Sequence, residues 1–230
     1  MIAGIDGCSK GWFAVTREGA NLLRTSVELE AFFDRCKIAA IDIPIGLVER
    51  GKRECDTQAR KFLGRRWMCV FTAPVRAIVH FREHADANRT SRELGEGGVS
   101  KQAVAIYPKI AEVDAILARR RDLHNRVVEV HPEVSFASWN GSPMMASKHK
   151  RAGRDARRTL VVASFGEVLF TNAMTVARGA AKEDDVLDAF AALWTAERIA
   201  RGEAQSLPDP RHRGGEGAAA PLSEGARIVY

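Results

Sequence analysis

The sequence has few cysteines, and their spacing argues against two common kinds of site. Only four occur in 230 residues, at Cys8, Cys36, Cys55 and Cys69, and no two of them form a CxxC pair. Structural zinc sites and disulfide-stapled folds need closer or more regular spacing. We therefore expect isolated, reduced thiols, as in cytosolic proteins.

Long hydrophobic runs are missing as well. No apolar stretch approaches the roughly 18 residues that suggest a membrane span, and the opening MIAGID has no basic leader of the kind that begins a signal peptide. Hydrophobic residues make up 46% and charged residues 28% of the chain, which is ordinary globular composition. We expect a cytoplasmic protein with a real core and no membrane partner.

The first fifty residues show short apolar runs around one amphipathic segment. A Gly-containing loop joins the first two runs, which predicts a hairpin, and the last run closes with Pro44 and Gly46, as a buried strand does. Strands are expected at 2–6, 12–16, 21–27 and 38–46, with a helix over 26–36. The predicted order is β-β-β-α-β.

Beyond residue 47 the pattern becomes helical and charged. Helices are expected over 53–67, 74–94, 99–121 with an interruption at Pro108, a short segment from Pro132, 155–179 and 182–202, and strands over 126–130 and 226–230. With no internal repeat in view, we predict one α/β domain over 1–230. We predict that this domain carries a largely helical insertion at about 47–122 and a loose tail from about 203.

Carboxylates occupy unusual positions in this pattern. Asp6 closes the first apolar run, Asp42 lies inside the strand at 38–46, and Glu129 interrupts the one at 126–130. Asp185 and Asp188 are three apart on a predicted helix and so share a face. Because buried carboxylates are almost always paired or bound to metal, these acids are expected to meet in one cluster.

Two interpretations of these acids stay open. Each strand acid alone could cap a helix or pair with an arginine. Taken together, oxygen donors without His or Cys suit Mg²⁺ or Mn²⁺. Such a cluster could support phosphodiester hydrolysis.

Basic residues are unevenly distributed. The net charge is +6, and the segment 147–158 (SKHKRAGRDARR) carries six Lys or Arg against one acid. This excess permits a polyanionic partner, although a solvated helix face is the simpler interpretation. Lys10 follows the first strand in a Gly-containing loop that resembles a phosphate cradle but lacks a full Walker pattern. His131, beside Glu129, is a candidate proton shuttle or a structural histidine.

Several segments together resemble a known family. They are IDGCSKGWFAV, AAIDIPIGL, CDTQAR with VFTAPVR, VSKQAVAIYPKI, VVEVHPEVSF and DDVLDAFAALWTAER. In this order they resemble the motifs of an uncharacterised bacterial and archaeal family of predicted ribonuclease H-like nucleases, from residue 2 to about 201. The resemblance implies a ribonuclease H-like fold, a mixed five-stranded sheet flanked by helices.

The resemblance also implies roles for individual residues. Asp6, Asp42, Asp185 and Asp188 would bind Mg²⁺ or Mn²⁺, with Glu129 as a further catalytic acid and a nucleic acid, DNA or RNA, as substrate. Substrate phosphates would be bound by Lys10, Lys148, Arg151 and Arg154. The C-terminal sequence after residue 210 departs from the family pattern. This departure affects the expectation for the last strand but not the expectation for the acids.

Two other functions stay open at this point. An ATP-dependent phosphotransferase of the actin and sugar-kinase type would place Asp6 on Mg²⁺, but it needs two such domains and the chain offers one. A non-catalytic nucleic-acid-binding module would retain the acids for structure. A homodimer is compatible with any of these functions.

Overall fold

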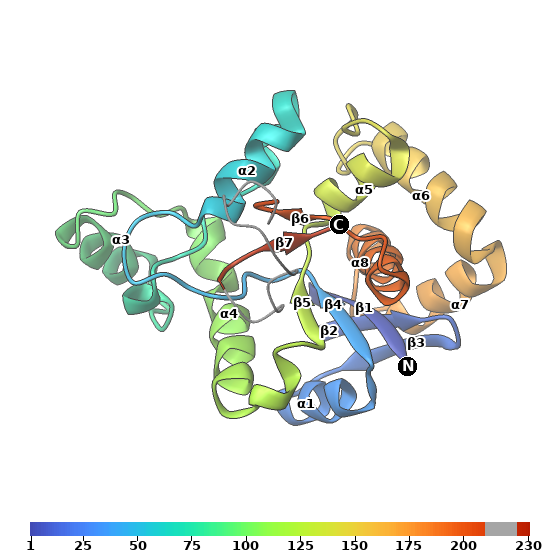
Figure 1. Cartoon of the computed structure of the whole chain (residues 1–230), viewed down its shortest axis with the longest axis horizontal. Helices are drawn as coiled ribbons and strands as arrows, with labels where there is room; N and C mark the ends of the chain where they lie inside the picture. Colours follow the sequence, from blue (N-terminus) through green and yellow to red (C-terminus); the bar gives the residue numbers. More distant parts are fainter. Residues whose placement is uncertain (210–224) are drawn as a thin grey trace.

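The computed structural model describes residues 1–209 and 225–230. Its centre is a five-stranded mixed sheet, in the order β3-β2-β1-β4-β5 (Figure 1). The strands are β1 (Ile2–Cys8), β2 (Gly11–Thr16), β3 (Gly19–Leu23), β4 (Ile38–Ile41) and β5 (Val127–Glu129). The first three strands are antiparallel neighbours, whereas β4 runs parallel to β1 and β5 parallel to β4. The predicted α/β class, the mixed five-stranded sheet and the β-β-β-α-β start are confirmed.

Helices cover both faces of the sheet. Helix α1 (Ser26–Arg35) and helix α4 (Lys101–Arg119) share one apolar core with inward-facing residues of β1 and β4, such as Ile5 and Ile41. Helix α8 (Glu183–Arg201) packs on the other face, against β1 and β4. A Cβ atom on Gly4 would lie 2.0 Å from the backbone nitrogen of Leu193. Only glycine therefore lets α8 approach β1 so closely.

The segment between β4 and β5 is largely helical. It contains α2 (Glu54–Leu63), the 3-10 turns η1 (Gly64–Cys69), η2 (Arg76–Ile78) and η3 (Arg121–Leu123), α3 (His84–Glu93) and α4. The helix predicted over 74–94 is wrong in its first half, where only η2 forms. Val75, Ile78 and Val79 are buried there in the core, and β-branched residues next to Pro74 disfavour an α-helix.

The helix predicted to be interrupted at Pro108 is instead continuous, because α4 runs through that residue. Pro108 lies on the exposed side of α4, whereas Tyr107 and Ile110 face the core. Water can replace the hydrogen bond that proline cannot donate, and the buried face holds the helix together.

The helix predicted over 155–179 is two helices, α6 (Arg151–Phe165) and α7 (Glu167–Ala177), which meet at an angle of 119°. Gly166, with φ of 86°, makes the bend. This bent pair satisfies length and composition criteria for a membrane span, but among the described residues no single helix does.

Helices α5 and α8 and the final strand agree in outline with the elements predicted from the sequence. Helix α5 (Pro132–Asn140) starts at its proline, as predicted, and α8 ends before the left-handed Gly202. The expected final strand is β7 (Ile228–Val229), which pairs with β6 (Ser206–Leu207) and makes one bridge to Val130. The middle of the predicted loose tail, 210–224, lies outside the described residues.

Candidate metal centre

Two of the predicted acids meet because their strands are parallel neighbours in register. Ile5 of β1 is paired with Ile41 of β4, so the next residues, Asp6 and Asp42, lie side by side on the same face of the sheet. The Asp42 backbone N–H donates to the Ile5 carbonyl at 2.9 Å and extends the ladder to this point. The two carboxylates therefore share the carboxyl end of the parallel strands.

Helix α8 supplies the third acid. One carboxylate oxygen from each of Asp6, Asp42 and Asp188 lies within 4.8 Å of the other two. Asp188 stands one residue before Ala189, whose carbonyl faces Gly4 at the closest approach of α8 to β1. The tight helix–sheet contact at Gly4 therefore brings Asp188 to the strand ends.

The three carboxylates are enclosed to different degrees. Asp188 is 1% exposed and Asp6 is 8% exposed, whereas Asp42 is partly exposed and connects the cluster to solvent. Burial raises the pKa of all three carboxyl groups. Mutual repulsion adds to it for Asp6 and Asp42, and the pKa of Asp42 reaches about 8. The free protein therefore binds protons or a cation at this point readily.

Lys148 is the cation in contact with the cluster. Its Nζ atom donates to Asp188 Oδ2, while Asp188 Oδ1 is buried with no hydrogen-bond partner among the described residues. Burial alone would lower the pKa of Lys148, but the carboxylates of Asp188 and Asp6 raise it. One lysine balances one of three negative charges, so the site can accept a further cation.

Buried contacts hold the loop that carries Lys148. Arg157, fully buried in α6, donates to both carboxylate oxygens of Glu133 at 2.7 Å and to the Ala146 carbonyl at 3.1 Å. A Cβ atom on Gly153 would lie 2.0 Å from the Ser147 carbonyl oxygen. The loop between α5 and α6 is thus packed tightly enough to position Lys148.

Asp185 lies next to the cluster but is not one of its three members. It is partly exposed in the first turn of α8, and its Oδ2 accepts a hydrogen bond of 2.8 Å from the Lys182 backbone N–H. Burial raises the pKa of Asp185, and the Lys182 N–H opposes the rise. Its role as a metal ligand stays a prediction.

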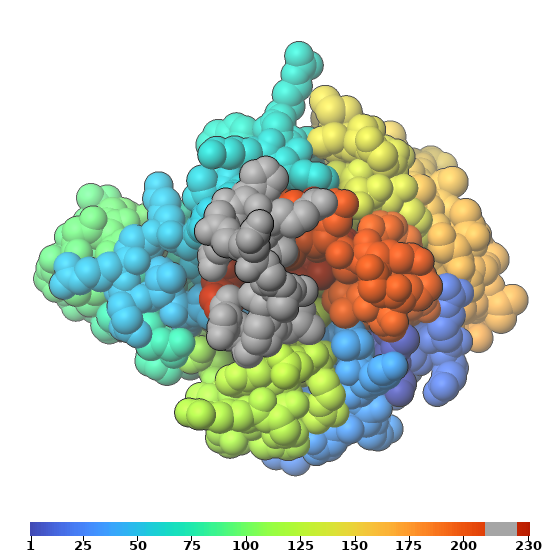
Figure 2. Space-filling view, viewed as in Figure 1, coloured from blue at the N-terminus to red at the C-terminus, as the bar shows by residue number. Residues whose placement is uncertain are grey.

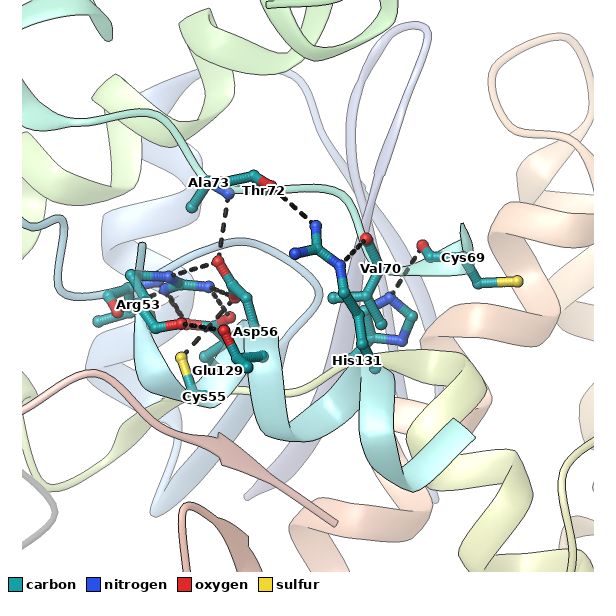
Figure 3. A network of polar contacts seen from close by, with 12 residues as sticks. Arg53, Cys55, Asp56, Cys69, Val70, Thr72, Ala73, Glu129 and His131 are labelled. Atoms are coloured by element: carbon teal, nitrogen blue, oxygen red, sulfur yellow. Dashed lines mark hydrogen bonds and ion pairs between the residues drawn. The ribbon is translucent and has the colours of Figure 1, made fainter. Parts of the chain in front are cut away.

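Glu129 does not join the cluster. It is paired in register with Ile41, not with Asp42, so it points to the opposite face of the sheet. Both its oxygens accept from Arg53, at 2.7 and 2.8 Å, and Oε2 also accepts from the Ile45 N–H at 2.7 Å (Figure 3). Burial raises the pKa of Glu129, and Arg53 opposes the rise. Of the two interpretations left open, pairing with an arginine is the one found here.

Arg53 and Asp56 complete this buried network, and neither was predicted from the sequence. Arg53 is 3% exposed and also donates to both oxygens of Asp56, with Nε at 3.2 Å from Oδ2 (Figure 3). A basic and an acidic residue three apart at a predicted helix start were the available signal, together with a strand glutamate that lacked a partner. That signal does not reveal which arginine meets Glu129.

His131 directly precedes α5. Its Nε2 donates to the Cys69 carbonyl at 3.3 Å, and its Nδ1 is buried without a partner among the described residues. Burial lowers the pKa of His131, so it is neutral at pH 7. A neutral imidazole can accept a proton at Nδ1, but its role as a proton shuttle stays a prediction.

The other predicted phosphate-binding residues do not contact the carboxylates. Lys10 is exposed in the turn between β1 and β2. Arg151 is 91% exposed, with Asp155 at 3.5 Å, and Arg154 lies 3.5 Å from Glu183. Lys148 is thus the one member of the predicted phosphate-binding group that the structure brings to the acids.

The arrangement as a whole can hold a hard cation. Three carboxylates, from β1, from the residue after β4 and from α8, offer oxygen ligands. One buried oxygen lacks a partner in the part of the chain that the structure describes, and one acid is partly open to solvent. Mg²⁺ and Mn²⁺ favour this kind of donor set.

Neither the curated proteins nor the solved structures include a match to this chain. The model of a family described as "Protein of unknown function (DUF429)" matches residues 4–213. That match covers most of the chain, and the protein therefore belongs to the DUF429 family.

Proposed function

We propose that this protein is a metal-dependent nuclease with a ribonuclease H-like fold. The observation that carries the proposal is the convergence of Asp6, Asp42 and Asp188 within 4.8 Å at the end of two parallel strands. The β-β-β-α-β start and the mixed five-stranded sheet support the affiliation that the sequence motifs imply.

The residues at this site fit a divalent cation. Three carboxylates face one ammonium group, so a fully ionised cluster keeps an excess of negative charge in a poorly solvated place. Asp6, Asp42 and Asp188 would hold the ion, and the unpartnered Oδ1 of Asp188 is an available ligand atom. An ion bound there would activate water and stabilise the leaving oxygen of a phosphodiester.

The chain's own groups would arrange the substrate. Lys148 reaches the cluster from the start of the basic segment 147–158, so it can contact the phosphate nearest the ion. Asp42 and Asp185 are the partly exposed acids, on the side where substrate and water must enter. Asp185 would orient a water molecule through the oxygen that does not cap α8.

The test begins with metal binding. Calorimetric titration with Mg²⁺ and Mn²⁺ should show binding to the wild-type protein and none to the Asp188→Asn protein. Asp155→Asn, a change at a 64% exposed side chain of α6, is the matched control and should bind as the wild type does.

Cleavage is measured next, on labelled duplexes, hybrids, junctions and single strands with each ion. We expect hydrolysis of at least one substrate by the wild type, and its loss in Asp6→Asn but not in Asp155→Asn. Cleavage that persists in Asp6→Asn, or no cleavage of any substrate with either ion, contradicts the proposal.

A further inference from the structure

Two apolar side chains project from the short η1 turn. Trp67 is 53% exposed and Met68 is 76% exposed. Of the other three tryptophans, all among the described residues, Trp12 is 1% exposed, and Trp139 and Trp194 are partly buried and stack on each other at 5.1 Å. Large apolar side chains that stay exposed together mark interaction sites.

The chain that follows these two residues is held firmly in place. Between residues 69 and 73, four residues are hydrogen-bonded to side chains from α2 or to His131, which directly precedes α5 (Figure 3). The partners are His131 for the Cys69 carbonyl (3.3 Å), Arg60 for the Val70 carbonyl (3.0 Å) and Thr72 Oγ1 (2.8 Å), and Asp56 for the Ala73 N–H (3.2 Å). The exposed pair thus stands on a pre-organised support, which lowers the entropy cost of binding.

The surface around Trp67 is positively charged. Residues 60–69 contain Arg60, Lys61, Arg65 and Arg66 and no acid. Lys61 and Arg65 are exposed, and Arg66 Nε is buried without a partner among the described residues. A second basic surface is formed by the exposed Lys150, Arg151 and Arg158 of the 147–158 segment, which starts in the loop between α5 and α6.

Both basic segments contact the start of α5, η1 through His131 and α6 through the ion pair of Arg157 with Glu133. Helix α2, which leads into η1, also packs against α5, and the loop after α5 carries Lys148. Lys148 in turn contacts Asp188. In the view of Figure 2, the cyan atoms of the α2 segment and the yellow atoms that follow α5 reach the same rim of the molecule.

We infer that Trp67 and Met68 form a stacking platform for unpaired bases of single-stranded nucleic acid, whose phosphates lie between Arg65 and the 147–158 segment. Exposed aromatic faces combined with positive charge are what single-stranded nucleic acids bind, whereas a duplex keeps its base faces stacked inside. The inference rests on the proposed function and names the substrate class of that site.

The test is a binding measurement without divalent metal. Fluorescence anisotropy of a labelled oligothymidylate of about 15 nucleotides is followed with the full chain in EDTA, with oligouridylate as the RNA arm. Trp67→Ala should weaken binding by about tenfold or more, and Trp67→Phe, which retains an aromatic face, should bind nearly as the wild type does. A blunt duplex of the same length should compete poorly.

The matched control is Val168→Ala, a change on α7 at a side chain that is 76% exposed, like Met68. It should bind as the wild type does. Equal binding by Trp67→Ala and Val168→Ala, or no binding of either oligonucleotide, overturns the inference. So does a wild-type dimer that Trp67→Ala converts to a monomer, because the platform would then be covered by a second copy.

The two proposals fail in different measurements. Loss of binding in Trp67→Ala in EDTA, without cleavage of any substrate by the wild type in Mg²⁺ or Mn²⁺, would support the platform and reject the nuclease. Metal-dependent cleavage with no effect of Trp67→Ala on binding would support the nuclease and reject the platform.

Discussion

Asp42 and Glu129 stand at the ends of neighbouring parallel strands and point to opposite faces of the sheet. The reason is the register, in which Glu129 is paired with Ile41 and not with Asp42. Because side chains alternate along a strand, this offset of one residue separates a candidate metal ligand from a structural ion pair.

Glu129→Gln should therefore weaken the fold and leave metal binding intact. The substitution removes one of the two carboxylate charges that balance Arg53, a side chain buried in the protein. Breaking one partner of a buried ion pair costs about 3 kcal/mol of free energy of unfolding. Urea denaturation measures that loss, and calorimetric titration of the folded variant measures Mg²⁺ binding. If binding disappears while the protein remains folded, Glu129 belongs to the metal site after all.

Gly4→Ala should destabilise the protein and displace Asp188. The added Cβ atom would meet the backbone of α8 at 2.0 Å, and backbone cannot yield as a side chain can. We expect a loss of about 3 kcal/mol in the free energy of unfolding, with weaker Mg²⁺ binding by the folded fraction. Gly98→Ala is the control, since its Cβ atom would meet only side-chain ends, the nearest being Arg92 Nη2 at 3.1 Å. Similar losses in the two variants would show that Gly4 has no special place in the packing.

The metal-free protein should lose stability as the pH rises. The pKa of Asp42 is raised from 3.8 to about 8 in the folded protein, so folding favours its protonated form. This contribution is complete below the unfolded-state pKa and is lost as the pH passes through about 8. The free energy of unfolding in EDTA, measured between these pH values, should fall less steeply in Asp42→Asn. A parallel pH profile in the two proteins would contradict the assignment.

Lys148→Ala should bind Mg²⁺ more tightly than the wild type. Removing the one ammonium group in contact with Asp188 leaves more negative charge for a metal ion to neutralise. A single charge contact of this kind corresponds to roughly tenfold in the binding constant. Calorimetric titration measures it. Lys10→Ala, at an exposed side chain without an ion pair to the three acids among the described residues, is the control. Weaker Mg²⁺ binding in Lys148→Ala would mean that the lysine supports the metal and does not compete with it.

Much of the scaffold follows from local patterns. The strand runs around residues 2–16 and 38–41, the helix over 26–35 and the proline at the start of α5 appear as predicted, because each is set by apolar periodicity and by turn or cap residues. The long-helix prediction over 155–179 fails at Gly166, since a glycine inside a helical pattern can be tolerated or can end the helix. Whether Gly166 is tolerated within one helix or ends it is decided only by the packing of α7 against β3.

By itself, the sequence determined the α/β class, the β-β-β-α-β start and the presence of acids in apolar strands, because these depend on residue type and spacing along the chain. The tertiary structure alone decided which acids meet. Strand register places Glu129 on the opposite face of the sheet, where it pairs with Arg53. The close approach of α8 at Gly4 places Asp188 next to Asp6 and Asp42. Both depend on contacts between residues distant in sequence, and no local pattern specifies such pairings.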